Sequence, residues 1–517
     1  MSEFGQGRSD RPRGNSNNRG GGQERRDSAG RTRNRGGNAP RQFSASAPSA
    51  RGRRADQARL TAFEVLRAVS EHDAYANLVL PNRIRENRLD RRDAGFATEL
   101  TYGALRGQGL YDAILARCVD RPLAQLDPAV LDTLRLGAHQ LLAMRVPNHA
   151  ALDEMVSLAR MVIGAGASGL INAVLRKVSL KDLETWSAEL VEGLSDENAA
   201  AAIVHSHPEW IVRALRQALV AHGRDATEIN DLLAADNLAP VVNLVALPGV
   251  GSLDEAMDQG AEPGTLVKDS AYYQGGDIAR LASVREGSTR VQDAGSQLVA
   301  RALAAVPLPD AGEDQYWLDL CAGPGGKAAL LAALAAQEGA RLTANEPAEH
   351  RAELVSKALI AIDPETWMIT VRDGREFAET EYAGGYDRIM VDAPCSGLGA
   401  LRRRPESRWR KSPKDVAELT ILQGELLDAA LSAVRVGGVV AYVTCSPHPA
   451  ETVAVIDDAL ARHKNVKLMD TGAALEASAL PGMANAARKV GEGSTVQLWP
   501  HIHSTDAMFM ALLTRTA

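Results

Sequence analysis

Cysteine is scarce in this chain of 517 residues, which contains only Cys118, Cys321, Cys395 and Cys445. Four cysteines over such a length do not make a disulfide framework, and no Cys-x-x-Cys pair supports a zinc site. No run of apolar residues approaches the ~18 that cross a membrane as a helix. These absences exclude a disulfide-stabilised secreted domain, and we expect a cytoplasmic protein with no membrane segment and no bound metal.

The first 54 residues have no lysine and almost nothing to bury, yet they contain 13 arginines against four acids, a net charge of +9. The whole chain has a net charge of −7, so the remaining residues carry −16. The Arg/Gly-rich composition predicts a disordered tail, and the segment lacks the apolar core of a signal peptide. It is either a weak RNA tether or a solubilising tail, and the sequence leaves both open.

Residues 55–185 show the spacing of helices. Apolar side chains recur from Leu60 to Val69 on one helical stripe, and Asp127-Pro128 has the form of an N-cap followed by proline at the first helical position. Residues 164–169 are expected to form a turn before a last helix. We predict an all-α domain, which periodicity alone does not distinguish from any other helical bundle.

The rest of the chain changes character twice. Residues 186–300 are expected to form a helical connector and a small α+β subdomain. From residue 316 strands and helices alternate, which predicts a multidomain protein ending in an α/β, Rossmann-like domain at 301–517, with a mostly parallel sheet. Strands are expected at 316–320, 341–345, 367–371, 386–391 and 438–443, with an antiparallel pair near 465–469 and 507–513.

A glycine-rich loop organises this last domain. From Tyr316 to Lys327 the chain reads Tyr-Trp-Leu-Asp-Leu-Cys-Ala-Gly-Pro-Gly-Gly-Lys, which predicts a strand, a tight loop and the start of a helix. That geometry holds anionic or nucleoside-bearing cofactors. Gly323-x-Gly325-x-x-Ala328 fits a dinucleotide-type loop, whereas a phosphate-binding P-loop needs Ser or Thr at the last of these positions. A strand-to-helix turn without a ligand is the plain alternative.

Four acids follow the first four expected strands, namely Asp319, Glu346, Asp373 and Asp392. In such sheets ligands bind beyond the carboxyl ends of the strands. Glu346 lies where a carboxylate accepts ribose hydroxyls, and Asp373 could accept from an adenine amino group. Each acid alone could cap a helix or face solvent, but four at one edge favour a cofactor site.

Two cysteines stand at the same edge, in Asp392-Ala-Pro-Cys395 and Tyr442-Val-Thr-Cys445. With the strand order 3-2-1-4-5 their strands are neighbours ~4.8 Å apart, so the two sulfurs would share one cleft. A thiolate there could add to carbon 6 of cytosine and make carbon 5 reactive enough to accept a methyl group, with Asp392 at ring nitrogen 3. Simple packing of each cysteine, or a regulatory disulfide, are the alternatives.

Together these motifs resemble the NOL1/NOP2/Sun family of RNA 5-methylcytosine methyltransferases. The resemblance rests on Asp319-Leu-Cys-Ala-Gly-Pro-Gly-Gly-Lys327, Asp392-Ala-Pro-Cys395-Ser-Gly and Thr444-Cys445-Ser. The helical region, especially residues 170–176, is similar to a NusB-like RNA-binding domain, as in bacterial Sun-type, RsmB-like rRNA methyltransferases. The resemblance covers about residues 55–517.

The resemblance implies an S-adenosyl-L-methionine-dependent cytosine-C5 methyltransferase that acts on RNA, with 16S rRNA as the expected substrate. In the family the Thr-Cys cysteine is the nucleophile and the Pro-Cys cysteine promotes product release, which assigns these roles to Cys445 and Cys395. Lys327 and Asp392 complete the expected catalytic set, and we expect a monomer. The cofactor-binding residues implied are Cys321, Ala322, Gly323, Pro324, Gly325, Gly326, Lys327, Glu346, Arg351, Asp373 and Asp392.

The sequence departs from the family pattern in two places. The Glu-Asn that usually follows the Thr-Cys loop reads Glu451-Thr452, and the expected Asp-Gly-Phe-Phe near the C-terminus reads Asp506-Ala-Met-Phe. The Arg/Gly-rich tail has no counterpart in the pattern. Residues 401–411, with six cations around Trp409, are predicted to track an RNA strand and to stack on one base, with a solvated charge run as the alternative.

Other classes of function stay open. An RNA-binding ribosome-assembly or antitermination factor would use the helical domain and the tail, with a vestigial catalytic domain, but the intact lysine, aspartate and cysteines argue against it. An NAD-linked enzyme would explain the glycine loop and leave both cysteine loops unused. DNA cytosine methylation needs only a Pro-Cys nucleophile, so the Thr-Cys site favours RNA.

Overall fold

The computed structural model describes residues 56–274, 276–310, 312–379, 384–481 and 494–517. All of these residues belong to one compact unit. The segment expected to be disordered, residues 1–54, lies outside the described residues. None of the described helices is long and apolar enough to span a membrane.

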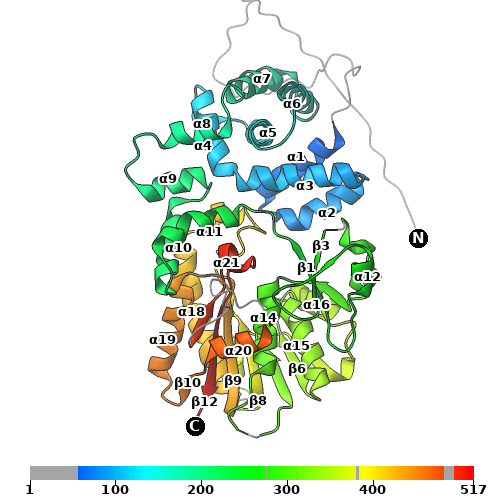
Figure 1. The fold of residues 1–517 in the computed structure, drawn as a ribbon, viewed down its shortest axis with the longest axis vertical. Helices are drawn as coiled ribbons and strands as arrows, with labels where there is room; N and C mark the ends of the chain where they lie inside the picture. Colours follow the sequence, from blue (N-terminus) through cyan, green and yellow to red (C-terminus); the bar gives the residue numbers. More distant parts are fainter. Residues whose placement is uncertain (1–55, 275, 311, 380–383, 482–493) are drawn as a thin grey trace, which may run out of the picture. The chain divides into compact units, whose positions relative to one another are not determined.

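A bundle of helices forms the first part of the described chain, as the apolar spacing predicts (Figure 1). Asp127 caps the fifth helix by accepting from the Ala129 amide at 2.8 Å, and Pro128 is the first helical residue. The apolar stripes meet in one core. The helices are α1 (Gln57–His72), α2 (Ala76–Glu86), α3 (Arg91–Arg106), α4 (Gln108–Cys118), α5 (Pro128–Leu142), α6 (Asn148–Val162), α7 (Ala165–Val178) and α8 (Leu183–Val191).

The turn expected at residues 164–169 is wrong. Helix α7 begins at Ala165, directly after Gly164, which has a φ of +123°. Glycine and alanine in this stretch suggested a loop, but Ala167 and Ser168 are buried. Packing of these small residues therefore outweighs the weak helix propensity of the two glycines inside the helix.

Three helices and a small sheet follow. The helices are α9 (Glu197–Val204), α10 (Glu209–Ala221) and α11 (Ile229–Asp236). The sheet has the order β2-β3-β1-β4 and is antiparallel throughout. The strands of this sheet and the two short helices between them are β1 (Val242–Ala246), α12 (Asp254–Asp258), β2 (Glu262–Pro263), β3 (Ser270–Tyr273), α13 (Ala282–Arg285) and β4 (Thr289–Val291).

The last part of the chain is built on a sheet of eight described strands with the order β10-β12-β9-β8-β5-β6-β7, in which β11 also pairs with β12. The five parallel strands have the order 3-2-1-4-5, the condition on which the expected meeting of the two cysteines depends, and β12 and β10 continue the sheet antiparallel as predicted. Sequence analysis missed β11. The strands are β5 (Tyr316–Asp319), β6 (Arg341–Asn345), β7 (Trp367–Thr370), β8 (Tyr386–Asp392), β9 (Val434–Thr444), β10 (Val466–Leu468), β11 (Thr495–Gln497) and β12 (Phe509–Arg515).

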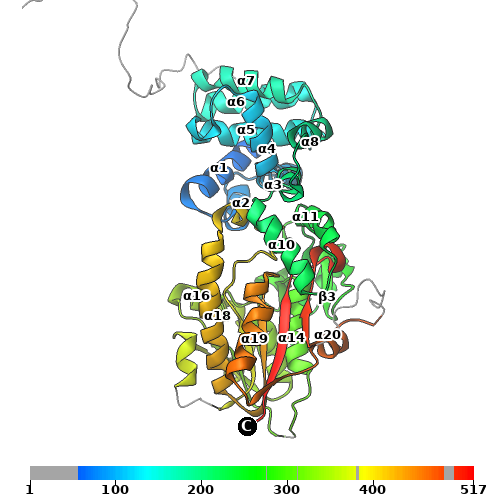
Figure 2. The same cartoon turned by 90° about the vertical axis from the view of Figure 1, so that its left-hand side faces the viewer.

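Helices cover both faces of this sheet (Figures 1 and 2). Along β9, Ala441 and Val443 pack into the core on one face, while Val440 and Tyr442 pack into the core on the other. Burial on both faces explains why the parallel strands read as continuous apolar runs. The helices are α14 (Ala294–Ala305), α15 (Gly326–Gln337), α16 (Glu349–Ala358), α17 (Ser407–Arg410), α18 (Pro413–Ala433), α19 (Val453–Arg462), α20 (Thr471–Ser478) and α21 (Pro500–His503).

Candidate active site

The glycine loop lies between β5 and α15, as predicted. Gly325 has a φ of +105°, a conformation that favours glycine, and a Cβ there would lie 2.4 Å from that of Ala358. A Cβ on Gly323 would lie 2.1 Å from Oε2 of Glu346. The loop therefore fits against its neighbours only because these positions carry no side chain.

Glu346 and Arg351 are held at this loop. The Glu346 side chain is almost fully buried, and its Oε1 accepts from the Ala348 amide at 3.1 Å. Arg351 lies 3.3 Å from the Glu346 carboxylate and donates to the Gly323 carbonyl oxygen at 2.9 Å. The predicted ribose acceptor is thus fixed in place beside the loop.

Asp319 is a candidate that sequence analysis noted but did not assign to the site. Its side chain is fully buried, and neither carboxylate oxygen has a hydrogen-bond partner among the described residues. Burial, and next the charge of Asp392, raise its pKa to about 7. A buried carboxyl without a partner fits a ligand that brings positive charge or hydrogen-bond donors, as the sulfonium and amino groups of S-adenosylmethionine do.

Lys327 contacts the acid at the end of β8. Its Nζ donates to Oδ2 of Asp392 at 2.8 Å, and the pair is largely enclosed. Burial works against the ammonium charge, but the adjacent Asp392 carboxylate outweighs it and raises the pKa of Lys327. The raised pKa therefore favours the charged form of Lys327 at the carboxyl ends of the strands.

The two cysteines of the predicted pair meet. Strands β8 and β9 are neighbours, and the Sγ atoms of Cys395 and Cys445 lie 3.4 Å apart as free thiols. The hydrogen bond from Cys395 lowers the pKa of Cys445 despite burial, and Lys327 acts in the same direction. That shared hydrogen bond, together with burial, raises the pKa of Cys395. The shared hydrogen bond therefore favours the thiolate at Cys445 and the protonated thiol at Cys395.

Glu451 joins the two cysteine loops. Its fully buried carboxylate accepts from the amide and hydroxyl of Ser396 at 2.7 and 2.5 Å, and from the hydroxyl of Ser446 at 2.6 Å. These serines directly follow Cys395 and Cys445. One carboxylate therefore sets the separation of the two loops, a role that sequence analysis missed because it noted this residue only as part of a family departure.

Asp373 and Cys321 have contacts of other kinds. Asp373 accepts from the amide of Arg375 at 3.0 Å, capping a short 3-10 helix, and also forms an ion pair with that side chain. These contacts are those of a helix cap, the alternative to cofactor binding that the sequence leaves open for Asp373.

Burial and three nearby acids raise the pKa of the Cys321 thiol, which keeps it uncharged. No cluster of three or more His, Cys, Asp or Glu side chains suited to a metal occurs within the described residues.

Residues 401–411, here called the arginine loop, do not form the RNA-tracking surface that the sequence predicts. Arg408 is fully buried and donates to the carbonyl oxygens of Arg106 and Asp236, and to Oδ1 of Asn237 at 2.7 Å. Burial lowers its pKa to about 10. This guanidinium joins the helical bundle to the rest of the chain rather than facing solvent.

Other cations of the arginine loop also contact protein. Arg402 and Arg403 form ion pairs with Asp293 and Asp506 at N–O distances of 2.5–3.0 Å. Arg410 donates to carbonyl oxygens at and just after the end of α1. The prediction of an RNA-binding patch is therefore wrong for four of its six cations, counting Arg408.

Comparisons with known proteins agree with this geometry. Residues 307–514 match the family model for the 16S rRNA methyltransferase RsmB/F, and residues 56–180 match the NusB family. Rv1407 of Mycobacterium tuberculosis H37Rv, provisionally named as a methyltransferase, is 49% identical over 469 residues, which cover 90% of this chain and 98% of the relative. Ribosomal RNA small subunit methyltransferase B of Pseudomonas putida KT2440 is 32% identical over 420 residues, covering 80% of this chain and 91% of the relative.

A solved structure shows the same fold. The crystal structure of PH0851 superimposes with a TM-score of 0.71 at 21% identity, covering 89% of this chain and 98% of that chain. The fold and the family matches together define a methyltransferase with a NusB-like helical domain. The chain belongs to the RsmB/F family of 16S rRNA methyltransferases. Membership of this family confirms the predicted fold class and S-adenosylmethionine as the cofactor.

Proposed function

We propose that this protein methylates carbon 5 of a cytosine in small-subunit rRNA, with Cys445 as the covalent nucleophile. The observation that carries the proposal is the 3.4 Å separation of the Cys395 and Cys445 sulfurs beside the Lys327–Asp392 pair. Carbon 5 of cytosine is too weak a nucleophile to accept a methyl group unaided. A thiolate added at carbon 6 supplies the missing electron density, so the chemistry needs a reactive cysteine.

In the proposed reaction Cys445 acts first. Its thiolate forms a bond to carbon 6, and the electron density displaced toward ring nitrogen 3 leaves carbon 5 enamine-like. The Asp392 carboxyl, protonated by the Lys327 ammonium that donates to it, presents this proton to ring nitrogen 3 and so stabilises this state. S-adenosylmethionine, when bound, supplies an electrophilic methyl group. The glycine loop, Glu346 and Arg351 are the residues proposed to hold it.

Product release requires the proton on carbon 5 to leave and the bond between carbon 6 and sulfur to break. As a thiolate, Cys445 keeps the pKa of Cys395 high through their shared hydrogen bond. Once Cys445 is bonded to carbon, that charge is gone, so Cys395 gives its own proton to water more readily and, as a thiolate, can accept the one from carbon 5. Cys445 then departs as a thiolate, which its lowered pKa favours.

The test uses the two cysteines separately. Wild-type protein, S-adenosylmethionine and a 16S rRNA transcript should give 5-methylcytosine at one position by bisulfite sequencing. Cys395→Ala should accumulate a protein–RNA adduct that survives denaturing electrophoresis, because the release step is blocked. The adduct should be absent from the double variant that also carries Cys445→Ala. An unmodified cytosine with the wild type, or an adduct in the double variant, contradicts the proposal.

A further inference from the structure

The carboxyl edge of the large sheet continues beyond the cysteines. Strand β12 runs antiparallel to β9, so the residues just before Phe509 lie next to the end of β9. The Ala507 amide donates to the Gly399 carbonyl, and the Gly399 amide donates to the Cys445 carbonyl, both at 2.9 Å. The glycine loop follows β5, which is separated from β12 by β8 and β9. The segment around Asp506 therefore flanks the reactive sulfur on the side away from the cofactor loop.

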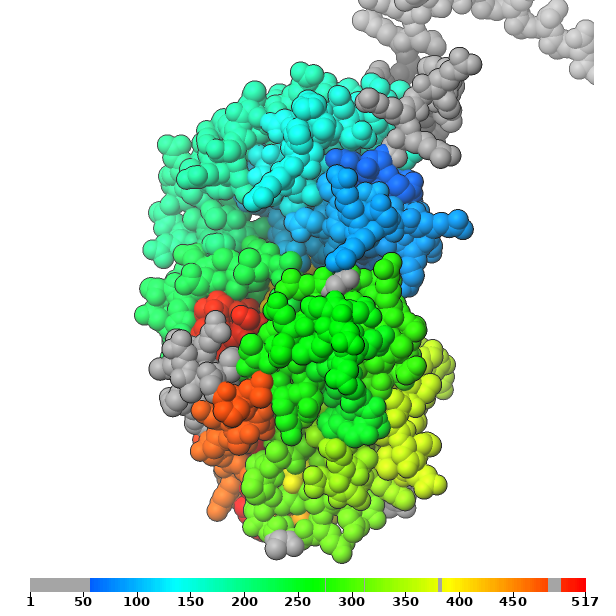
Figure 3. Space-filling view, turned by 45° about the vertical axis from the view of Figure 1, so that its right-hand side comes forward, coloured from blue at the N-terminus to red at the C-terminus, as the bar shows by residue number. Residues whose placement is uncertain are grey.

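A cavity of about 550 Å³ lies in this region. Residues of the bundle, of the small sheet and of the arginine loop line it, among them Asn77, Tyr102, Arg106, Gln292, Arg402 and Asp506. In Figure 3 the bundle, in blue, and the small sheet, in green, lie against one another at the surface. Three parts of the chain therefore line the cavity, and Asp506 in its wall is followed by Ala507, which is hydrogen-bonded to Gly399 in the loop after Cys395.

Gln292 is the distinctive side chain of this cavity. It is only 7% exposed, yet neither its amide nitrogen nor its amide oxygen has a hydrogen-bond partner among the described residues. Buried polar groups are nearly always paired, so this amide has one donor and one acceptor available for a ligand. A glutamine or asparagine amide that offers both groups side by side reads the edge of a nucleobase in nucleic-acid complexes.

Two further groups suit a planar polar ligand. The half-buried ring of Tyr102 lines the cavity, with the Arg106 guanidinium 5.3 Å from its centroid. The Nε of Arg106 and the Oδ1 of Asn77 also have no partner among the described residues. Aromatic faces bearing a nearby arginine are the usual stacking surfaces for bases.

The charges of the wall favour a base over a phosphate. Arg402 and Arg403 neutralise Asp293 and Asp506 within the wall itself. A phosphate would meet the carboxylates of Glu99, Asp293 and Asp506 as well as three guanidiniums, and the guanidiniums of Arg402 and Arg403 are already paired. An uncharged ring with donors and acceptors on its edge meets no such repulsion.

We propose that this cavity binds a second nucleobase of the substrate RNA, adjacent to the target base, with Gln292 hydrogen-bonded to its edge and Tyr102 against its face. The proposal rests on the proposed function, because the second base belongs to the strand whose cytosine reaches Cys445. It makes Gln292 a determinant of which sequence around the target is accepted.

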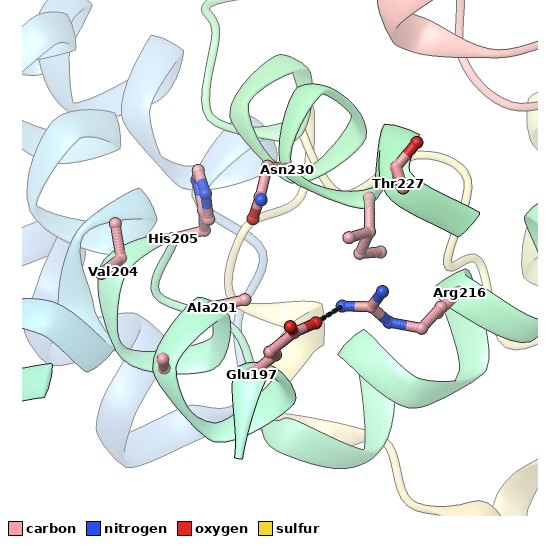
Figure 4. A pocket seen from close by; sticks show the side chains of 9 residues that line it. Glu197, Ala201, Val204, His205, Arg216, Thr227 and Asn230 are labelled. Carbon is pink, nitrogen blue, oxygen red and sulfur yellow. Dashed lines mark ion pairs between the residues drawn. The ribbon is translucent and has the colours of Figure 1, made fainter. Parts of the chain in front are cut away.

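A second cavity, of about 520 Å³, lies among α9, α10 and α11 and does not share these properties. Figure 4 shows Arg216 facing Glu197 across this cavity, joined by an ion pair. Arg216 also donates to Oδ1 of Asn198 at 3.0 Å, and Asn230 is hydrogen-bonded to His205. These polar groups are already paired with one another, so the second cavity has no unpaired amide that could hydrogen-bond to the edge of a base.

The experiment measures kcat and KM of the full chain on a 16S rRNA transcript whose methylated cytosine has been mapped. Gln292→Ala should raise KM roughly tenfold and leave kcat within about twofold, since a good bidentate contact to a base is worth about 1–3 kcal/mol. Gln337→Ala, an exposed glutamine at the end of α15, should change neither constant. A fall in kcat with unchanged KM would overturn the proposal.

Transcripts with the neighbouring bases replaced give a second arm that needs no variant. For the wild type, replacement of one neighbour should lower kcat/KM by about 5- to 150-fold. Gln292→Ala should reduce that discrimination to below about twofold. Equal use of every transcript by the wild type, or full discrimination by the variant, would overturn the cavity proposal. Failure of the wild type to form any 5-methylcytosine would instead overturn the proposed function.

Discussion

The cysteine loops and the arginine loop belong to the same domain and both look functional in the sequence, but the fold uses them in opposite ways. The sulfurs of Cys395 and Cys445 face one another at the carboxyl edge. The two Nη atoms of the buried Arg408 guanidinium donate to carbonyl and amide oxygens of the bundle and of the segment after it, and only its Nε has no partner among the described residues. The difference teaches that a candidate catalytic site is recognised by reactive side chains that face one another. A buried arginine whose hydrogen bonds go to the protein stabilises the fold instead, even when it lies in a strongly basic run.

The largest effect is expected at Cys445, the proposed nucleophile. Cys445→Ala should lower the rate of methyl transfer to the 16S rRNA transcript by at least about 10⁴-fold, as for other covalent nucleophiles. Cys118→Ala is the matched control, because Cys118 is buried in the helical bundle, and its rate should stay within about twofold. Transfer of a radiolabelled methyl group measures both. A Cys445→Ala protein that keeps more than about a hundredth of the wild-type rate would show that Cys445 is not the nucleophile.

Arg408 should matter for stability instead of chemistry. Arg408→Met leaves several buried oxygens without a donor and should cost about 3–5 kcal/mol in the free energy of unfolding. Arg404→Met, in the same loop but exposed over the ring of Tyr75, should cost less than about 1 kcal/mol. Urea unfolding of the full chain compares the two. Equal costs would mean that the arginine loop is a surface feature after all.

Glu451 tests whether the cysteine loops need a fixed separation. Glu451→Gln removes the charge that accepts from both serines, and a shift of about 1 Å between the loops should lower kcat about 100-fold with little change in KM. Glu425→Gln, an exposed acid on α18 paired with Arg375, is the control. A change in KM alone would assign Glu451 to RNA binding rather than to positioning.

The pH dependence of Cys445 is a smaller effect. Cys395 lowers the pKa of Cys445 by hydrogen bonding, so Cys395→Ala should raise that pKa and move the alkylation of Cys445 to higher pH. The sign follows because only the thiolate reacts with iodoacetamide. Mass spectrometry of the Cys445 peptide across a pH series gives the midpoint. Cys395→Ser keeps a hydroxyl donor and should shift it less, and a midpoint that falls in either variant refutes the pairing.

The smallest effect is expected at Trp409. Its ring packs against Gly109 of α4, where a Cβ would lie 2.6 Å away, although 38% of the residue remains exposed. Trp409→Ala should therefore change KM for the transcript by less than about twofold. A base stacked on the ring would instead be worth about 1–3 kcal/mol, or at least about fivefold. A larger rise in KM would restore the stacking platform that the sequence suggests.

The parallel strands could be predicted from the sequence because they depend on local signals, and the meeting of the cysteines followed once the strand order 3-2-1-4-5 was assumed. Apolar runs ending in Asp392 or Thr444 mark the strands, and each cysteine lies within three residues of such an end. The carboxyl ends of parallel strands lie at one edge of the sheet, so residues that directly follow two neighbouring strands lie close together in space. The glycine loop was predictable for the same reason.

The partners of the arginines could not be predicted. Arg408 meets Asn237, 171 residues away, and Arg410 meets Val69, 341 residues away. No spacing rule links positions so distant, and a basic run has the same composition whether it is solvated or enclosed. The free carboxyl of Asp319 was hidden likewise, because only burial distinguishes it from an ordinary acid at a strand end.

Enclosure of the arginine loop has a consequence for how this protein can be taken apart. Arg408 and Arg410 are part of the methyltransferase region, yet their hydrogen bonds end on the bundle and on the segment after it. The bundle is therefore not a detachable module joined by a tether. Exchange of the bundle for that of a relative should succeed only if the loop that enters it is exchanged at the same time.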